Sequence, residues 1–200
     1  DHLISGQAAL LRTVGLSGQE AVIAAPAGLC INLGRAGISG DGPKSRMGVA
    51  MRLRELLDEL PAPKTDEEES GRKRRKNKDG DGKDDESDLS PADKALRQMR
   101  RGELMALITA NRVDDILLAL DLIQTYELNA ALIGCTEGHL VADAIAAAGV
   151  GVLLGPTTTQ PDSFQHSHAV YENPAILHAA GVPIALRSGG AHFARMLPTQ

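Results

Sequence analysis

Two short motifs could bring reactive side chains together. His166-Ser167-His168 has the two-residue spacing of a metal-ligand pair, but it lies in a polar loop and its nearest carboxylate is Asp162. A metal ion needs further deprotonated N, O or S donors around such a pair. We therefore favour an exposed loop over a metal site at this motif.

Cys135 suggests a different chemistry, that of a cysteine nucleophile. It stands just before a predicted helix, whose N-terminal dipole favours a thiolate, and His139 follows four residues later. His139 would point along the helix rather than back at the sulfur, and no carboxylate is placed to orient it. A small residue packed at a strand end is the interpretation that we favour.

Glycine-rich segments offer two further candidates. The glycines of residues 149–155 lie in and before a predicted strand, whereas a dinucleotide-binding loop needs them after one, so we reject that function. Ser188-Gly189-Gly190 follows the last predicted strand, near Arg187 and Arg195, and is better placed for weak anion binding.

The elements that must position these residues alternate along the chain. Short apolar runs predict strands at residues 29–33, 104–109, 130–134, 150–155 and 182–187. Amphipathic stretches predict helices at residues 44–60, 90–101, 113–126, 138–148 and 172–180. Ser90 and Asn173 are predicted N-caps, and Gly149 and Gly181 are predicted left-handed C-caps. Repeated strand–helix units indicate an α/β fold with parallel strands.

Five such units leave two architectures open. One is an open five-stranded sheet, and the other is the C-terminal half of a (β/α)8 barrel of the TIM type, which needs eight strands. In the half-barrel, the strands at residues 29–33 and 182–187 would be exposed edges. A half-barrel alone is therefore not expected to be a stable monomer.

The composition and charge of the chain argue against several other classes of protein. Residues 64–88 carry 18 of the 47 charged side chains and no apolar one, which predicts a disordered charged insertion at about residues 61–90. The net charge of −5 and the near absence of aromatic residues argue against a nucleic-acid-binding domain. No apolar run approaches a membrane span, and two distant cysteines predict reduced thiols. The chain lacks an initiator Met and reads as cut from a longer one, so its compartment is undetermined.

Several sequence segments, in the order in which they occur along the chain, resemble the imidazolonepropionase-like branch of the amidohydrolase superfamily. They are Gly6-Gln7-Ala8-Ala9, Pro26-Ala27-Gly28-Leu29-Cys30-Ile31-Asn32-Leu33-Gly34, Ala110-Asn111-Arg112-Val113-Asp114-Asp115-Ile116-Leu117, Thr136-Glu137, Leu140-Val141-Ala142-Asp143, Leu154-Gly155-Pro156, Tyr171-Glu172-Asn173-Pro174-Ala175 and Ala180-Gly181-Val182. The resemblance covers nearly the whole chain outside residues 61–90. It implies a barrel whose strands 4 to 8 are the five predicted here.

The resemblance also implies where a Zn or other divalent metal centre would be. Amidohydrolases hold their metal at the carboxyl ends of the strands, where it activates a water molecule. The matched ligand positions are Cys30 for a Lys, Thr109 and Asn111 for a His-x-His pair, Gly134 for a His, and Gly189 or its neighbour Ser188 for an Asp. None offers an imidazole or a carboxylate, so we predict no bound cofactor. Other residues that could line the former pocket are Arg112, Cys135, Glu137, Ser188 and His192.

These matches favour a catalytically degenerate barrel, a pseudoenzyme with a structural or binding role. The alternative is an active metal-dependent hydrolase of C–N bonds whose ligands come from other parts of a longer chain. The expected partners are the remainder of that chain and a second copy of it.

Overall fold

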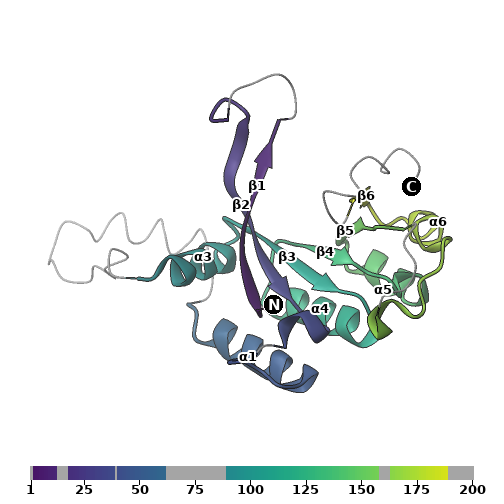
Figure 1. Cartoon of the computed structure of the whole chain (residues 1–200), viewed down its shortest axis with the longest axis horizontal. Coiled ribbons are helices and arrows are strands. Elements are labelled where there is room, and N and C mark those ends of the chain that lie inside the picture. Colours follow the sequence, from purple (N-terminus) through teal and green to yellow (C-terminus); the bar gives the residue numbers. More distant parts are fainter. Residues whose placement is uncertain (1, 13–17, 39, 62–88, 158–162, 189–200) are drawn as a thin grey trace, which may run out of the picture.

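The computed structural model describes residues 2–12, 18–38, 40–61, 89–157 and 163–188. A six-stranded sheet forms its centre, with the strands in chain order from edge to edge (Figure 1). They are β1 (Ile4–Leu11), β2 (Val22–Asn32), β3 (Met105–Ala110), β4 (Ala130–Gly134), β5 (Gly151–Leu154) and β6 (Ile184–Leu186). β1 is antiparallel to β2, and each later strand is parallel to its neighbour. The predicted α/β class with parallel strands is confirmed.

Helices make the crossover connections that parallel neighbours require. α1 (Arg46–Asp58) and α3 (Pro91–Arg100) lie between β2 and β3, α4 (Val113–Thr125) joins β3 to β4, α5 (Ala142–Ala147) joins β4 to β5, and α6 (Asn173–Ala179) joins β5 to β6. Three short 3-10 turns, η1 (Gly34–Gly37), η2 (Gly138–Leu140) and η3 (Phe164–His166), lie in the connections. None of the helices in the described ranges has the length and hydrophobicity needed to cross a membrane.

Local sequence signals fix several helix ends as predicted. The Ser90 hydroxyl accepts a hydrogen bond from the Asp93 backbone N–H at 3.2 Å, with Pro91 in the first turn, so the predicted cap of α3 is confirmed. Gly149 and Gly181 follow α5 and α6 with φ of +66° and +84°. They are the left-handed caps that the sequence predicts.

Three local predictions are wrong. The sequence predicts five strands, but β1 is a sixth; its residues, Ile-Ser-Gly-Gln-Ala-Ala-Leu-Leu, lack a buried alternation, and pairing with β2 holds it in place. β2 is therefore covered on that side, and the edges are β1 and β6. The predicted helix at 138–148 is split into η2 and α5 because Val141 has a non-helical φ of −133°.

The two faces of the sheet differ in burial. The strand residues that pack into one core with side chains of all five helices are fully or almost fully buried: Leu29, Ile31, Ala106, Ile108, Leu132, Val152 and Leu154. The alternating residues on the other face are half-buried: Cys30, Leu107, Thr109, Ile133 and Leu153. A mostly parallel sheet with helices over one face is consistent with part of a TIM-barrel-like fold. The predicted insertion lies, apart from residues 61, 89 and 90, outside the described residues.

Candidate functional site

The carboxyl ends of β2 to β6 meet at one edge of the sheet because these strands are parallel. The strand register pairs Asn32 with Thr109 and Ala110 with Gly134, so Thr109 lies one position before the strand ends. Cys30 pairs with Leu107 and lies two residues further from the edge than Asn32. Ser188 is half-buried just after β6. Gly189 and His192 lie outside the described residues.

Asn111 and Gly134 fit together where two metal ligands are expected from the family resemblance. Gly134 has a φ of +93°, and a Cβ atom at this position would overlap the Asn111 side-chain oxygen. The Thr136 hydroxyl donates to that same oxygen at 3.1 Å. The Cys135 N–H donates to the Ala110 carbonyl at 2.8 Å and fixes this segment against β3. The space beside position 134 is therefore filled by the Asn111 amide.

Glu137 is the charged residue held most firmly at this edge. Its side chain is 6 % exposed, and its Oε2 atom accepts a hydrogen bond at 2.8 Å from the backbone N–H of Val113, the first residue of α4. A carboxylate is favourable at a helix N-terminus because the first N–H groups have no partner within the helix. The Glu137 N–H donates to the Asn111 carbonyl at 2.8 Å, so both ends of the residue are tied to the β3–α4 connection.

His168 meets Glu137 from the loop that precedes α6. Its Nδ1 atom lies 2.7 Å from Glu137 Oε1. His166 instead has its Nδ1 atom 3.3 Å from the Ser163 hydroxyl. The two histidines therefore do not share a ligand position, and the structure gives no support to a metal pair there. Sequence reasoning found both Glu137 and His168 but missed their pairing, because 31 positions separate them.

Arg112 lies beside this pair, at the N-cap of α4. Its guanidinium stacks over the Phe164 ring at 5.1 Å, and its Nε atom is 3.3 Å from Asp114 Oδ1. The contact with Phe164 ties the loop that carries His168 to the end of β3. Arg187 lies further along the same edge and donates from Nε to the Gly155 carbonyl at 3.0 Å.

The two thiols are poor candidates for chemistry. Cys135 is fully buried, and burial raises the pKa of its thiol to about 12. Burial also raises the pKa of Cys30. A thiol is nucleophilic or metal-binding only as the thiolate. Cys135 also precedes the three-residue turn η2 rather than a long helix, so the helix dipole that was expected to favour its thiolate is missing.

Asn173 is not the helix cap that the sequence predicts, and its side chain connects α6 to the segment after β4. It is predicted to cap α6, but Glu172 occupies the N-cap and Asn173 lies inside the helix, where it is buried. Its Nδ2 atom donates to the Cys135 carbonyl at 2.9 Å. This tertiary hydrogen bond replaces the local one that the sequence pattern favours.

Among the described residues, the side chains at the strand ends do not fit a divalent metal ion. Thr109 and Asn111 offer neutral oxygens, the Asn111 oxygen already accepts from Thr136, and Gly134 offers no donor. Burial raises the pKa of the Cys30 thiol and so disfavours the thiolate that would bind a metal. Within the described part of the chain, no three His, Cys, Asp or Glu side chains converge as a metal site would require.

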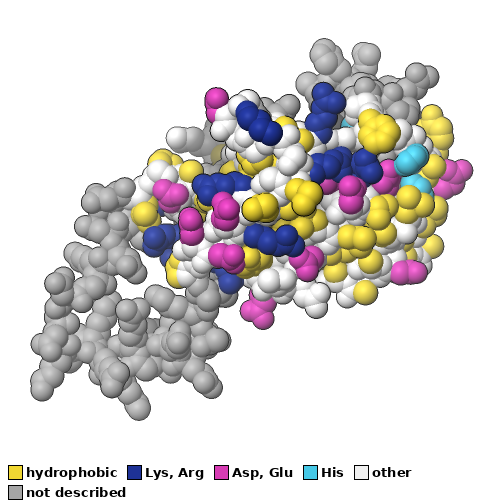
Figure 2. Space-filling view, turned by 90° about the horizontal axis from the view of Figure 1, so that it is seen from below, with side chains coloured by type: hydrophobic (Ala, Val, Ile, Leu, Met, Phe, Trp, Pro, Cys, Tyr) yellow, Lys and Arg dark blue, Asp and Glu magenta, His cyan; other side chains and the backbone are white. Residues whose placement is uncertain are grey.

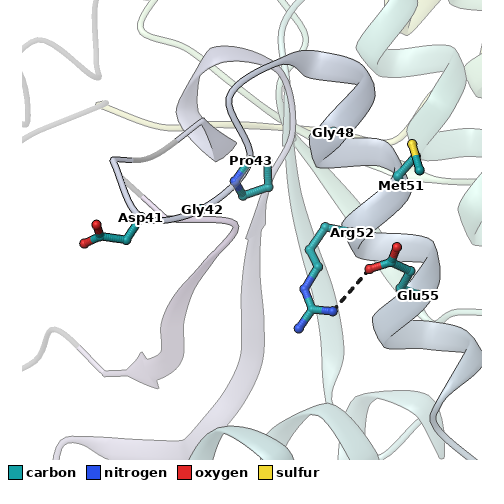
Figure 3. Close-up of a pocket in the computed structure, with 7 residues that line it drawn as sticks. All are labelled: Asp41, Gly42, Pro43, Gly48, Met51, Arg52 and Glu55. Carbon is teal, nitrogen blue, oxygen red and sulfur yellow. Dashed lines mark hydrogen bonds and ion pairs between the residues drawn. The ribbon is translucent and has the colours of Figure 1, made fainter.

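A surface hollow of about 400 Å³ lies between residues 41–43 and one side of α1 (Figure 3). Met51 lines it together with the ion pair between Arg52 and Glu55, whose atoms are 3.2 Å apart. This hollow holds none of the residues predicted for the site. We therefore place the candidate site at the strand ends.

Comparison with known proteins supports the architecture. No family model matches the sequence, and no curated protein matches it. The fold is similar to the crystal structure of an amidohydrolase from Thermotoga maritima MSB8, with a TM-score of 0.74 and 22 % sequence identity. The match covers 92 % of this chain and 47 % of that chain, so this chain spans about half the length of its structural neighbour. The chain therefore has an amidohydrolase-like fold.

Proposed function

We propose that this chain is the barrel segment of an imidazolonepropionase-like amidohydrolase that has lost its metal centre and serves as a structural or binding module. The amidohydrolase-like fold supports the architectural part of this proposal. The motifs that resemble the imidazolonepropionase-like branch support the finer assignment. The observation that carries the loss of the metal is the Asn111 amide filling the space beside Gly134.

The chemistry of the lost site explains why this observation matters. A metal-dependent hydrolase needs three or more N or O ligands and an open position where water is activated. A histidine at position 134 would displace Asn111, which is itself held by Thr136. Restoring the ligand set therefore needs several simultaneous substitutions. The residues now present are instead suited to packing at the strand ends without a metal ion.

A binding role is supported by the half-buried face of the sheet. Apolar residues such as Leu107, Ile133 and Leu153 lie on it beside Cys30. We propose the remainder of a longer chain, or a second copy of this one, as the partner that covers this face. Covering it would remove apolar surface from water and so contribute to the free energy of assembly.

Metal analysis of the full chain tests the proposal. We expect less than about 0.1 equivalent of zinc, manganese or iron per chain after incubation with each metal and gel filtration, since affinity requires deprotonated ligands. The triple variant Thr109→His, Asn111→His and Gly134→His is the matched positive control, because it restores three imidazoles at the ends of β3 and β4, the number that such a site requires. One tightly held ion per natural chain, together with amide hydrolysis lost on chelation, would instead establish the active metal-dependent C–N hydrolase.

A further inference from the structure

A buried carboxylate holds an exposed imidazole at the carboxyl edge of the sheet. The Glu137 side chain is 6 % exposed and the His168 side chain 67 %, with 2.7 Å between Oε1 and Nδ1. The Val113 N–H holds the second carboxylate oxygen at 2.8 Å. The Val113 N–H on one oxygen and the His168 ring nitrogen on the other hold the carboxylate facing the imidazole.

This contact sets the direction in which the ring can accept a proton. When Nδ1 carries the hydrogen donated to Glu137, Nε2 carries the lone pair. No hydrogen bond engages Nε2 among the described residues, and the exposed ring leaves it open to water. A positioned carboxylate also holds the ring in one tautomer and one orientation.

The loop that carries His168 is fixed on both sides. Before it, Phe164 packs under the Arg112 guanidinium at 5.1 Å. After it, Asn173 donates to the Cys135 carbonyl at 2.9 Å. These contacts join the loop to the ends of β3 and β4, so the imidazole is presented by a scaffold rather than by a free segment.

From this geometry we propose that Glu137 and His168 form a metal-independent general-base site that hydrolyses small aromatic esters. His168 Nε2 takes a proton from a water molecule while the water oxygen forms a bond to the ester carbonyl carbon. The C–O bond to the leaving group then breaks, the phenolate departs, and the imidazolium releases its proton to solvent. The step consumes one water and yields a carboxylic acid and a phenol. Glu137 is a positioning residue, and this site goes beyond the proposed function.

The surroundings of His168 define the substrate class. Phe164 and Tyr171 are 71 % and 74 % exposed, and Val170 is also exposed, so the loop offers apolar and aromatic surface to a substrate. Histidine side chains reach the surface beside Lys, Arg and acidic side chains, with apolar surface around them (Figure 2). The site lacks an assigned acid to protonate an amine, which favours an ester whose leaving group departs as the anion.

Steady-state hydrolysis of 4-nitrophenyl acetate by the full chain tests this site. We expect His168→Gln to lower kcat/KM by about 100-fold, in the range of a lost general base, and Glu137→Gln by about tenfold. His178→Asn is the matched control, because His178 is an exposed histidine on α6 outside this cluster. Circular dichroism of each variant checks that the buried Glu137 change leaves the fold intact.

Three outcomes would overturn the proposal. The first is activity no greater than that of free imidazole at equal concentration. The second is an equal loss in His168→Gln and His178→Asn, which would make any surface histidine responsible. The third is an equal rate in H2O and D2O, because proton transfer from water must slow in D2O. A slower rate in D2O for the natural chain, absent in His168→Gln, would support the general-base step.

Discussion

The two faces of the sheet are built from alternating residues of the same strands, yet they differ in what covers them. Ile108 on β3 is fully buried against the helices, whereas its neighbour Leu107 is only half-buried on the opposite face. The same contrast separates Ile31 from Cys30 on β2. The helix-covered face carries the stability of the fold. The other face carries Cys30 and Thr109, two of the positions that the family resemblance matches to metal ligands.

The largest expected loss of stability follows a substitution on the helix-covered face of the sheet. Ile108→Ala should lower the free energy of unfolding by about 3 kcal/mol, since it leaves a cavity that the surrounding core fills only partly. Leu107→Ala, one residue away, should cost about 1 kcal/mol, because its side chain is already partly in water. Chemical denaturation of both variants measures the difference. Equal losses would mean that the second face is as well packed as the first.

A smaller loss of stability is expected from a substitution just after the end of β2. Gly34 has a φ of +65°, and a Cβ atom there would overlap Asp115 Oδ2. Gly34→Ala should cost about 2 to 3 kcal/mol, part from the left-handed backbone and part from the overlap. Gly149→Ala is the matched control, with a φ of +66° and nothing within 4 Å of the added carbon.

The difference between these two variants isolates the contact with Asp115. Thermal or chemical unfolding of Gly149→Ala should report the backbone cost alone, about 1 kcal/mol. If Gly34→Ala were no less stable than Gly149→Ala, the close packing between η1 and α4 would be refuted.

The smallest expected effect is a pH dependence of the stability that arises from the buried carboxyl group of Asp115. Burial raises the pKa of its carboxyl from 3.8 to about 6, although Arg46 lies 2.9 Å away and opposes this shift. The folded chain therefore binds more protons than the unfolded chain between these values, and stability should fall as pH rises from about 4 to 6. The stabilisation of the protonated form is lost above pH 6.

Asp115→Asn should remove this part of the pH dependence, worth up to about 2 kcal/mol. Denaturation at pH 4.5 and pH 7 compares the natural chain with the variant. Asp121→Asn, on the exposed side of α4 where Asp121 pairs with Arg54, is the matched control and should keep the dependence. An unchanged pH dependence in Asp115→Asn would show that another group is responsible.

Local patterns predicted most of the parallel sheet. Strands β3 to β6 and helices α4 and α6 lie within two residues of their predicted bounds, because apolar periodicity and caps such as Ser90 act over a few residues. The helix predicted at 138–148 is the exception, since it is split into η2 and α5. The resemblance to amidohydrolases could also be found from short segments of the sequence. β1 was not, since its residues form a strand only by pairing with β2 across a hairpin.

The sequence by itself determined which side chains stand at the positions that the family resemblance matches to metal ligands, since Thr109, Asn111 and Gly134 have the same side chains in any conformation. Only the tertiary structure decided what those residues do instead. The overlap between Asn111 and position 134, the burial of Cys135 and the 2.7 Å contact between Glu137 and His168 all join separate strand ends or loops. Such contacts depend on the register of the parallel strands and on crossover packing, which no local pattern encodes.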